Sequence, residues 1–277
     1  NHIGVEGAKA IAGALKDSVL TSLNLSTNAL CGRGDQTAGI VAIAEALKVK
    51  GVVLTELNLR NNGIGVEGAK AIGDALHFNI VLTDLNLSSN RLCGLFNDLN
   101  DGVVGGIYTA DGVTAIADAL HVNGVLTSLD LRLNEIGDEG AKAIGAALHV
   151  NSVLTTLNLD GSELPIKQLK GTNPVDMLDL SNKELGAASG IVIAKCIEVN
   201  SVLTELNLSN NQLCGMVYVG GGRWEGTYTA KGINAIANAL HVNSVLTELD
   251  LRWNDLGDGE AALREIAKDR PSLTLKL

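Results

Sequence analysis

The chain has 277 residues, a formal net charge of −10 and a sequence isoelectric point of about 4.9. This acidity disfavours nucleic acids and anionic membranes as partners, because both repel negative charge, and it favours a basic surface on another protein. No stretch approaches the roughly 18 consecutive apolar residues of a membrane-spanning helix, so the sequence predicts no membrane insertion.

A six-residue segment with leucine at its first, fourth and sixth positions recurs along the chain. It begins at Leu20, Leu54, Leu82, Leu126, Leu154, Leu203 and Leu246, and looser copies occupy 175–180 and 273–277. The base period is 28 residues, with three longer steps and two shorter ones, of 21 and 26 residues. Because leucine alternates with polar residues, each segment is predicted to be a short strand with one buried face.

An amphipathic helix is predicted to follow most of the strands. The residues after the strand read Asn-x-Ile/Leu-Gly, as in 134–137, and a helical pattern such as 138–149 comes next. Its small and aliphatic residues fall on one side, which predicts a buried helix face. Asp138 is the predicted N-cap residue of this helix.

These residues resemble leucine-rich repeats of the ribonuclease-inhibitor subtype, which also forms the sensor end of NOD-like receptors and the body of Ran GTPase-activating proteins. The resemblance covers nearly the whole chain. It implies an α/β fold, a right-handed leucine-rich-repeat solenoid or horseshoe with a parallel β-sheet on its concave side and helices on its convex side. We therefore predict a single leucine-rich-repeat array over residues 1–277.

Three places along the chain depart from the regular repeat. The chain begins in mid-repeat at Asn1, which predicts that it is a fragment of a longer protein. Residues 158–178 form an irregular short repeat with Pro165 and Pro174, where we predict a turn or short 3₁₀ segment and a change in curvature. Residues 259–277, with a charged helix face and a final strand, form the predicted C-terminal cap.

Two long insertions, at 94–108 and 215–228, separate a strand from its helix. Five of the seven aromatic residues lie there: Phe96, Tyr108, Tyr218, Trp224 and Tyr228. A shorter insertion occupies residues 32–37, and the strands that follow the three insertions end in Arg60, Arg132 and Arg252. Tyrosine, tryptophan and arginine are favoured anchors of interfaces, and binding groups often lie on loops, so we predict partner-binding loops. In the alternative interpretation, each loop packs on its own repeat and the arginines hold its backbone.

The exposed face of the sheet is the second candidate surface. Its middle column consists of Asn and Asp, which favours a side-chain ladder that stabilises the sheet. The flanking columns vary in charge and include Glu56, Glu205 and Glu248 among the predicted binding residues. Leu133 and Trp253 occupy one matched position beside this face, where other repeats carry polar residues or glycine, and matched apolar groups favour a contact site.

The sequence shows neither a catalytic motif nor a metal-ligand cluster. The four cysteines are expected to be small, reduced core residues, which favours a cytoplasmic or other intracellular location. A repeated histidine at 77, 121, 149 and 241 is explained by favourable charge at helix ends. We therefore predict no enzyme activity, no cofactor and no metal.

The predicted function is non-catalytic recognition of another protein through the concave sheet and the loops at 94–108 and 215–228. Two alternatives remain open at this point. By resemblance, the chain could be a GTPase-activating protein of the Ran-activator type, which would supply a polar residue to a GTPase site. It could also be a structural subunit of a larger assembly.

Overall fold

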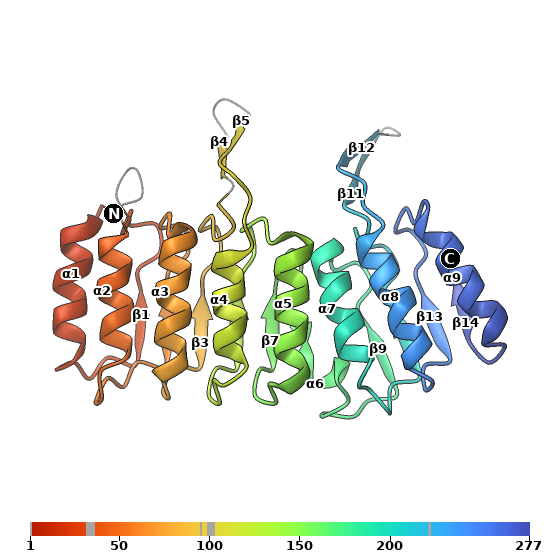
Figure 1. The fold of residues 1–277 in the computed structure, drawn as a ribbon, viewed down its shortest axis with the longest axis horizontal. Helices are drawn as coiled ribbons and strands as arrows, with labels where there is room; N and C mark the ends of the chain where they lie inside the picture. The colour runs from red at the N-terminus through yellow and green to blue at the C-terminus, as the bar shows by residue number, and fades with distance from the viewer. Residues whose placement is uncertain (1, 32–36, 95, 99–102, 221–222) are drawn as a thin grey trace. The chain divides into compact units, whose positions relative to one another are not determined.

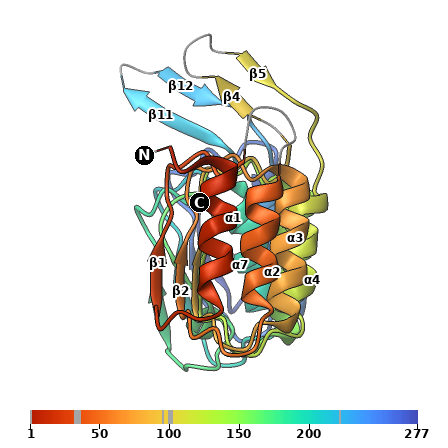
Figure 2. The same cartoon turned by 90° about the vertical axis from the view of Figure 1, so that its left-hand side faces the viewer.

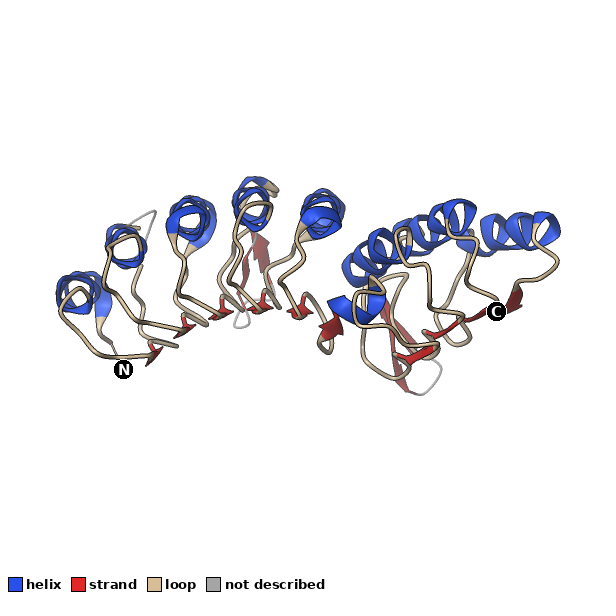
Figure 3. Ribbon diagram, turned by 90° about the horizontal axis from the view of Figure 1, so that it is seen from below, coloured by secondary structure: helices blue, strands red, loops and turns tan. Residues whose placement is uncertain are grey.

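A computed structural model describes residues 2–31, 37–94, 96–98, 103–220 and 223–277. The chain divides into two compact units, residues 1–157 and 158–277. Within each unit the helices form one layer and the short strands form another (Figures 1 and 3). The prediction of one continuous array over 1–277 remains a prediction.

In the first unit, strands and helices alternate along the chain. The helices are α1 Gly4–Leu15, α2 Ala38–Leu47, α3 Gly65–Phe78, α4 Asp111–Leu120 and α5 Gly137–Val150. The strands of its parallel sheet are, in spatial order, β1 Ser22–Asn24, β2 Glu56–Asn58, β3 Asp84–Asn86, β6 Ser128–Asp130 and β7 Thr156–Asn158. A separate hairpin consists of β4 Phe96–Asp98 and β5 Val103–Gly105.

The second unit repeats this plan after an irregular start. It begins with β8 Leu164–Pro165 and the one-turn helix α6 Ile166–Leu169. Its sheet contains, in spatial order, β9 Met177–Asp179, β10 Glu205–Asn207, β13 Glu248–Asp250 and β14 Thr274–Lys276. The helices are α7 Ala187–Ile197, α8 Lys231–Val242 and α9 Gly259–Asp269, and the hairpin is β11 Met216–Gly220 with β12 Arg223–Gly226.

The strand leucines form the core in register. Leu57 lies opposite Leu23 on one side and Leu85 on the other, and in the second unit Leu206 lies between Leu178 and Leu249. All but Leu23 are buried, and the apolar helix faces cover them. The predicted strand alternation and the parallel α/β arrangement are therefore confirmed.

A buried asparagine braces the turn after most strands. The residues are Asn62, Asn90 and Asn134 in the first unit and Asn211 and Asn254 in the second. Asn134, for example, is 1% exposed; its Oδ1 accepts from the Asn90 and Leu92 amides at 2.8 and 3.3 Å. Its Nδ2 donates to the Leu87 and Leu131 carbonyls at 3.0 and 2.8 Å. One side chain thus satisfies buried backbone groups that the strands leave unpaired.

The helix after this turn begins earlier than the sequence predicts. Gly137 is the first residue of α5, Ile136 precedes it, and no side chain caps the helix by a hydrogen bond. The prediction that Asp138 is the N-cap residue is therefore wrong. Asp138 lies in the first turn, where its negative charge is favourable beside the positive end of the helix dipole.

The short repeat lacks the asparagine brace, because Ser162 follows its strand at the equivalent position. The predicted turn or 3₁₀ segment is instead the single α-helical turn of α6. Asp160 supplies the main polar contacts there: it accepts hydrogen bonds from the Ser189 hydroxyl and from the Ser189 amide, at the start of α7. One carboxylate therefore attaches this turn to the next helix.

Candidate functional site: two matched hairpin segments

The two long insertions fold into antiparallel β-hairpins rather than irregular loops. Phe96 of β4 pairs with Gly105 of β5, and Tyr218 of β11 pairs with Trp224 of β12. Each hairpin projects beyond the edge of its own unit at which the following helix begins (Figures 1 and 2). Valine-rich stretches beside Asp101-Gly102 and beside the glycines at 220–222 are the sequence signal for these hairpins. We call residues 82–140 the first hairpin segment and residues 203–260 the second.

The base of each hairpin is closed in the same way. The Thr109 amide donates to the Cys93 carbonyl at 3.1 Å, and the Thr229 amide donates to the Cys214 carbonyl at 2.9 Å. Each hairpin starts at a glycine with positive φ, Gly94 at 79° or Gly215 at 75°. A Cβ on Gly94 would lie 2.5 Å from the carbonyl oxygen of Ile107, so glycine is required for the close crossing.

A tyrosine at the end of each insertion attaches the hairpin to the next repeat. The Tyr108 hydroxyl donates to the Ile136 carbonyl at 2.8 Å, and the Tyr228 hydroxyl donates to the Leu256 carbonyl at 2.9 Å. Both rings lie over a glycine, Gly137 in one segment and Gly257 in the other. Burial raises the pKa of Tyr108 above its ordinary value of about 10, at which the hydroxyl is already protonated and able to donate near neutral pH. Both tyrosine hydroxyls therefore make contacts within the protein, on the following repeat rather than on their own.

The turns that the tyrosines hold also display the two apolar residues. Leu133 is 68% exposed and Trp253 is 77% exposed, three residues before the carbonyls that Tyr108 and Tyr228 contact. Both have positive φ, 55° and 62°. Equivalent turn positions with positive φ hold small or polar residues: Thr27, Asn61, Ser89, Asn182 and Asn210. Leucine and tryptophan are unfavourable in this conformation, and here neither gains the benefit of burial.

The arginines two residues after β6 and β13 are held on the sheet face by the aspartates that end these strands. Arg132 donates through Nε and Nη2 to the two carboxylate oxygens of Asp130, and Arg252 does the same to Asp250. Arg252 lowers the pKa of Asp250 by donating these hydrogen bonds. Arg60 is exposed two residues after β2, where Asn58 occupies the position of the aspartate.

The middle Asn/Asp column of the sheet face mainly caps its own strands. Side chains such as Asn58, Asp130 and Asp250 accept a hydrogen bond from the amide two residues later, at 3.0 to 3.1 Å. One contact between strands matches the expected ladder, from Asn86 Nδ2 to Asp130 Oδ2 at 3.2 Å. The column is therefore largely a set of local caps.

The remaining candidate residues are distributed over several strands. Glu56 on β2 is exposed, Glu205 on β10 is half-buried, and Glu248 on β13 forms an ion pair with Lys276. The side chains of Phe96, Tyr218 and Trp224 lie outside the described part of the structure, although their backbones belong to hairpin strands. Their role as binding residues stays a prediction.

The cysteine side chains are buried, and all four are free thiols. Burial raises the pKa of Cys93, Cys196 and Cys214 to about 12 and that of Cys31 to about 11. Few thiolates therefore form near neutral pH, so the cysteines are core residues rather than nucleophiles. Among the described residues, no group of three or more His, Cys, Asp or Glu side chains could hold a metal ion. Within the same residues, no helix has the length and apolar character to cross a membrane.

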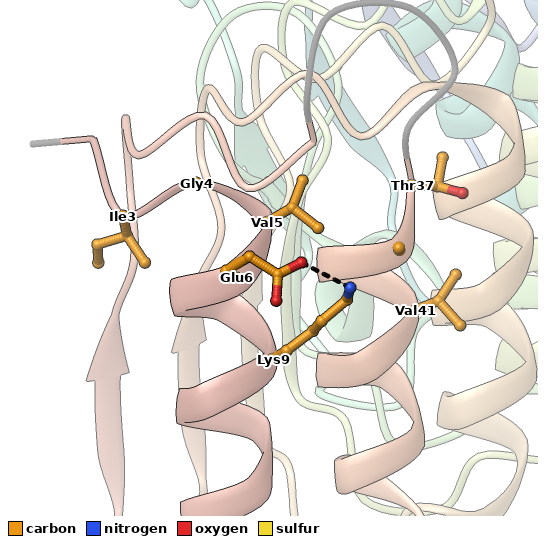
Figure 4. Close-up of a pocket in the computed structure, with 8 residues that line it drawn as sticks. Ile3, Gly4, Val5, Glu6, Lys9, Thr37 and Val41 are labelled. Atoms are coloured by element: carbon orange, nitrogen blue, oxygen red, sulfur yellow. Dashed lines mark hydrogen bonds and ion pairs between the residues drawn. The ribbon is translucent and has the colours of Figure 1, made fainter.

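A shallow depression lies between the starts of α1 and α2 (Figure 4). Ile3, Val5 and Val41 supply its apolar lining, and Lys9 pairs with Glu6 at 2.8 Å. The two charged side chains of the depression therefore pair with each other, and we assign no ligand to the depression.

Comparisons with known proteins identify the repeat. A family model described as "Leucine Rich repeat" matches residues 53–73, 122–145 and 242–259, and a second model, "Leucine Rich Repeat", matches 202–219. A search of curated proteins found no match.

Three solved structures illustrate the structural similarity. Leiomodin-1 actin-binding site 2 is 25% identical, with a TM-score of 0.41 over 56% of this chain and 76% of that one. The tropomodulin C-terminal domain of Caenorhabditis elegans is 11% identical, with a TM-score of 0.32 over 73% and 91%. TLR13 in complex with ssRNA13 is 15% identical, with a TM-score of 0.36 over 85% and 26%. At these TM-scores we transfer no function from them. The matched repeats, with the alternating parallel strands and helices, identify the fold as an α/β solenoid of leucine-rich repeats.

Proposed function

We propose that the chain is a non-catalytic recognition module that binds another protein through the two hairpin segments and the adjoining sheet face. The observation that carries this proposal is the display of Leu133 and Trp253 in exposed, positive-φ turns. Such a residue gains little from burial and adds an unfavourable backbone conformation, so it does not benefit the isolated fold. A partner that covers it would supply the missing burial.

The charge of the chain supports a basic partner surface. The net charge is −10, and most of the arginine charge on the sheet face of the hairpin segments is already offset by Asp130 and Asp250. A basic partner is attracted to this acidic chain and associates with it faster, whereas acidic proteins are repelled. We further propose the ribonuclease-inhibitor-like subtype, which the 28-residue period and the helix in most repeats support. The buried free thiols support an intracellular location.

The test is a comparison of protein capture by the wild-type chain and a Leu133→Asn, Trp253→Asn double variant. Asparagine tolerates positive φ, as Asn61 and Asn210 show, so folding stability should change by no more than about 1 kcal/mol. We expect proteins captured from an extract of the source cell by the wild-type chain to be lost by the double variant.

A matched control uses polar replacements at the same turn position. Asn61→Ser with Asn210→Ser should leave capture unchanged, because neither asparagine is an apolar anchor. Capture that persists in the Leu133→Asn, Trp253→Asn variant would overturn the proposal. So would a large fall in its thermal unfolding midpoint by circular dichroism, since the two residues would then be packing groups.

A further inference from the structure

We infer that the chain carries two equivalent binding sites, one in each hairpin segment, for a protein segment that presents an apolar side chain between basic side chains. This inference rests on the proposed function, because it specifies how many sites recognise the partner and what they recognise.

The two segments share the contacts described above, and from Tyr108 and Tyr228 onward they correspond position by position. Tyr108, Arg132 and Leu133 correspond to Tyr228, Arg252 and Trp253 with a constant offset of 120 residues. The tyrosine contacts differ by only 0.1 Å, 2.8 against 2.9 Å. The arginine Nε atoms donate to the preceding aspartate at 3.1 and 3.0 Å. The hairpin, the glycine at its base, the tyrosine contact and the exposed apolar turn residue therefore occur together in both segments. We call these features a set.

Each set is complete within its own compact unit. The contacts of the first set lie between Cys93 and Gly137, and those of the second lie between Cys214 and Gly257. The unit boundary falls after Leu157, outside both sets. Neither site therefore needs a residue from the other unit, and each should bind its own copy of the ligand.

The charges beside each apolar residue define the ligand chemistry. Glu135 and Glu139 are exposed after Leu133, and Asp255 and Asp258 are exposed after Trp253. The arginine of each set already pairs with its aspartate, so each turn keeps an excess of negative charge. In the plain turn that holds Asn61, Gly63 occupies the position of Glu135 and Asp255. A ligand that covers the apolar side chain therefore gains most if lysine or arginine flanks its own apolar anchor.

The two sites should differ in affinity but not in specificity. Tryptophan offers a larger contact area than leucine and is enriched among the residues that dominate interfaces. We therefore expect the site at Trp253 to bind the same ligand more tightly than the site at Leu133.

The experiment selects binders from a phage-displayed library of random short peptides on the full chain. The peptide chosen from this selection is then titrated by isothermal calorimetry against four proteins: the wild type, Leu133→Asn, Trp253→Asn and the double variant. We expect the selected peptides to combine an apolar residue with flanking lysine or arginine. We expect two bound peptides per wild-type chain, one per single variant, and at least about tenfold weaker binding to the double variant.

A peptide with each lysine and arginine replaced by glutamate is the matched control, and it should not bind. One site in the wild type, or selected peptides that are neutral or acidic, would overturn the inference. If either of these results is found but the double variant still loses protein capture, the inference is overturned and the proposed function stands. If neither protein capture nor peptide selection yields a binder, both the inference and the proposed function are overturned.

Discussion

The two turns that display Leu133 and Trp253 are held differently from the turn of the short repeat. In the hairpin segments, the turn with Leu133 or Trp253 is braced by a buried asparagine, Asn134 or Asn254, and by a tyrosine of the preceding insertion. In the short repeat the equivalent position is Ser162, and Asp160 is the main attachment. The turns that display an exposed apolar side chain are therefore held by two side chains, an asparagine and a tyrosine.

The largest effect should follow the loss of an asparagine brace. Asn134→Ala removes the acceptor of the Asn90 amide and the donor to the Leu131 carbonyl, whereas the Leu87 carbonyl keeps its hydrogen bond from Asn90 Nδ2. Because unsatisfied buried groups are costly, we expect a loss of about 3–5 kcal/mol in the free energy of unfolding, measured by urea denaturation.

Ser162→Ala in the short repeat is the matched control for this prediction. Ser162 is only half-buried, so its replacement should change stability by no more than about 0.5 kcal/mol. Equal losses for Asn134→Ala and Ser162→Ala would show that the two kinds of turn do not differ in how they are held.

The strand leucines and the buried asparagines of the turns show which features the sequence predicts and which it does not. The leucine alternation was sufficient for the strands, because leucines such as Leu57 and Leu85 lie in register exactly one period apart. The Asn-x-Ile/Leu-Gly pattern marks the stretch between strand and helix, but it does not indicate that its asparagine is buried. Burial of a polar residue depends on which backbone groups the neighbouring repeat leaves unpaired, and a linear pattern does not reveal these groups.

The tyrosine contacts were unpredictable for a related reason. Tyr108 reaches the carbonyl of Ile136, one period later, across a glycine that leaves room for its ring. The sequence identified Tyr108 and Tyr228 as unusual, but it left interface binding and self-packing open. The pairing of Arg132 with Asp130 was accessible in principle, since residues two apart on a strand share a face.

A smaller effect should follow the loss of a tyrosine contact. Tyr228→Phe keeps the ring over Gly257 and removes the hydrogen bond to the Leu256 carbonyl, so we expect a loss of about 1 kcal/mol. Hydrogen exchange of the Thr229 amide, which closes the hairpin base, should become faster. Tyr108→Phe is the matched variant in the first segment. A loss in one segment without a similar loss in the other would break the equivalence of the two sites.

The smallest effect concerns charge on the sheet face. Arg252 donates to the Asp250 carboxylate and so holds its pKa below the ordinary value of 3.8; Lys276 adds a weaker attraction. Because the folded-state pKa is the lower one, this stabilisation is present above the unfolded pKa and is lost as pH falls through the folded pKa.

Arg252→Met should therefore raise the pKa of Asp250 in an NMR titration and reduce stability slightly at neutral pH, with the difference disappearing in acid. Lys276→Met should raise the same pKa by less. If the pKa of Asp250 is unchanged in Arg252→Met, the arginine does not hold the carboxylate, and its side chain would be available to a partner.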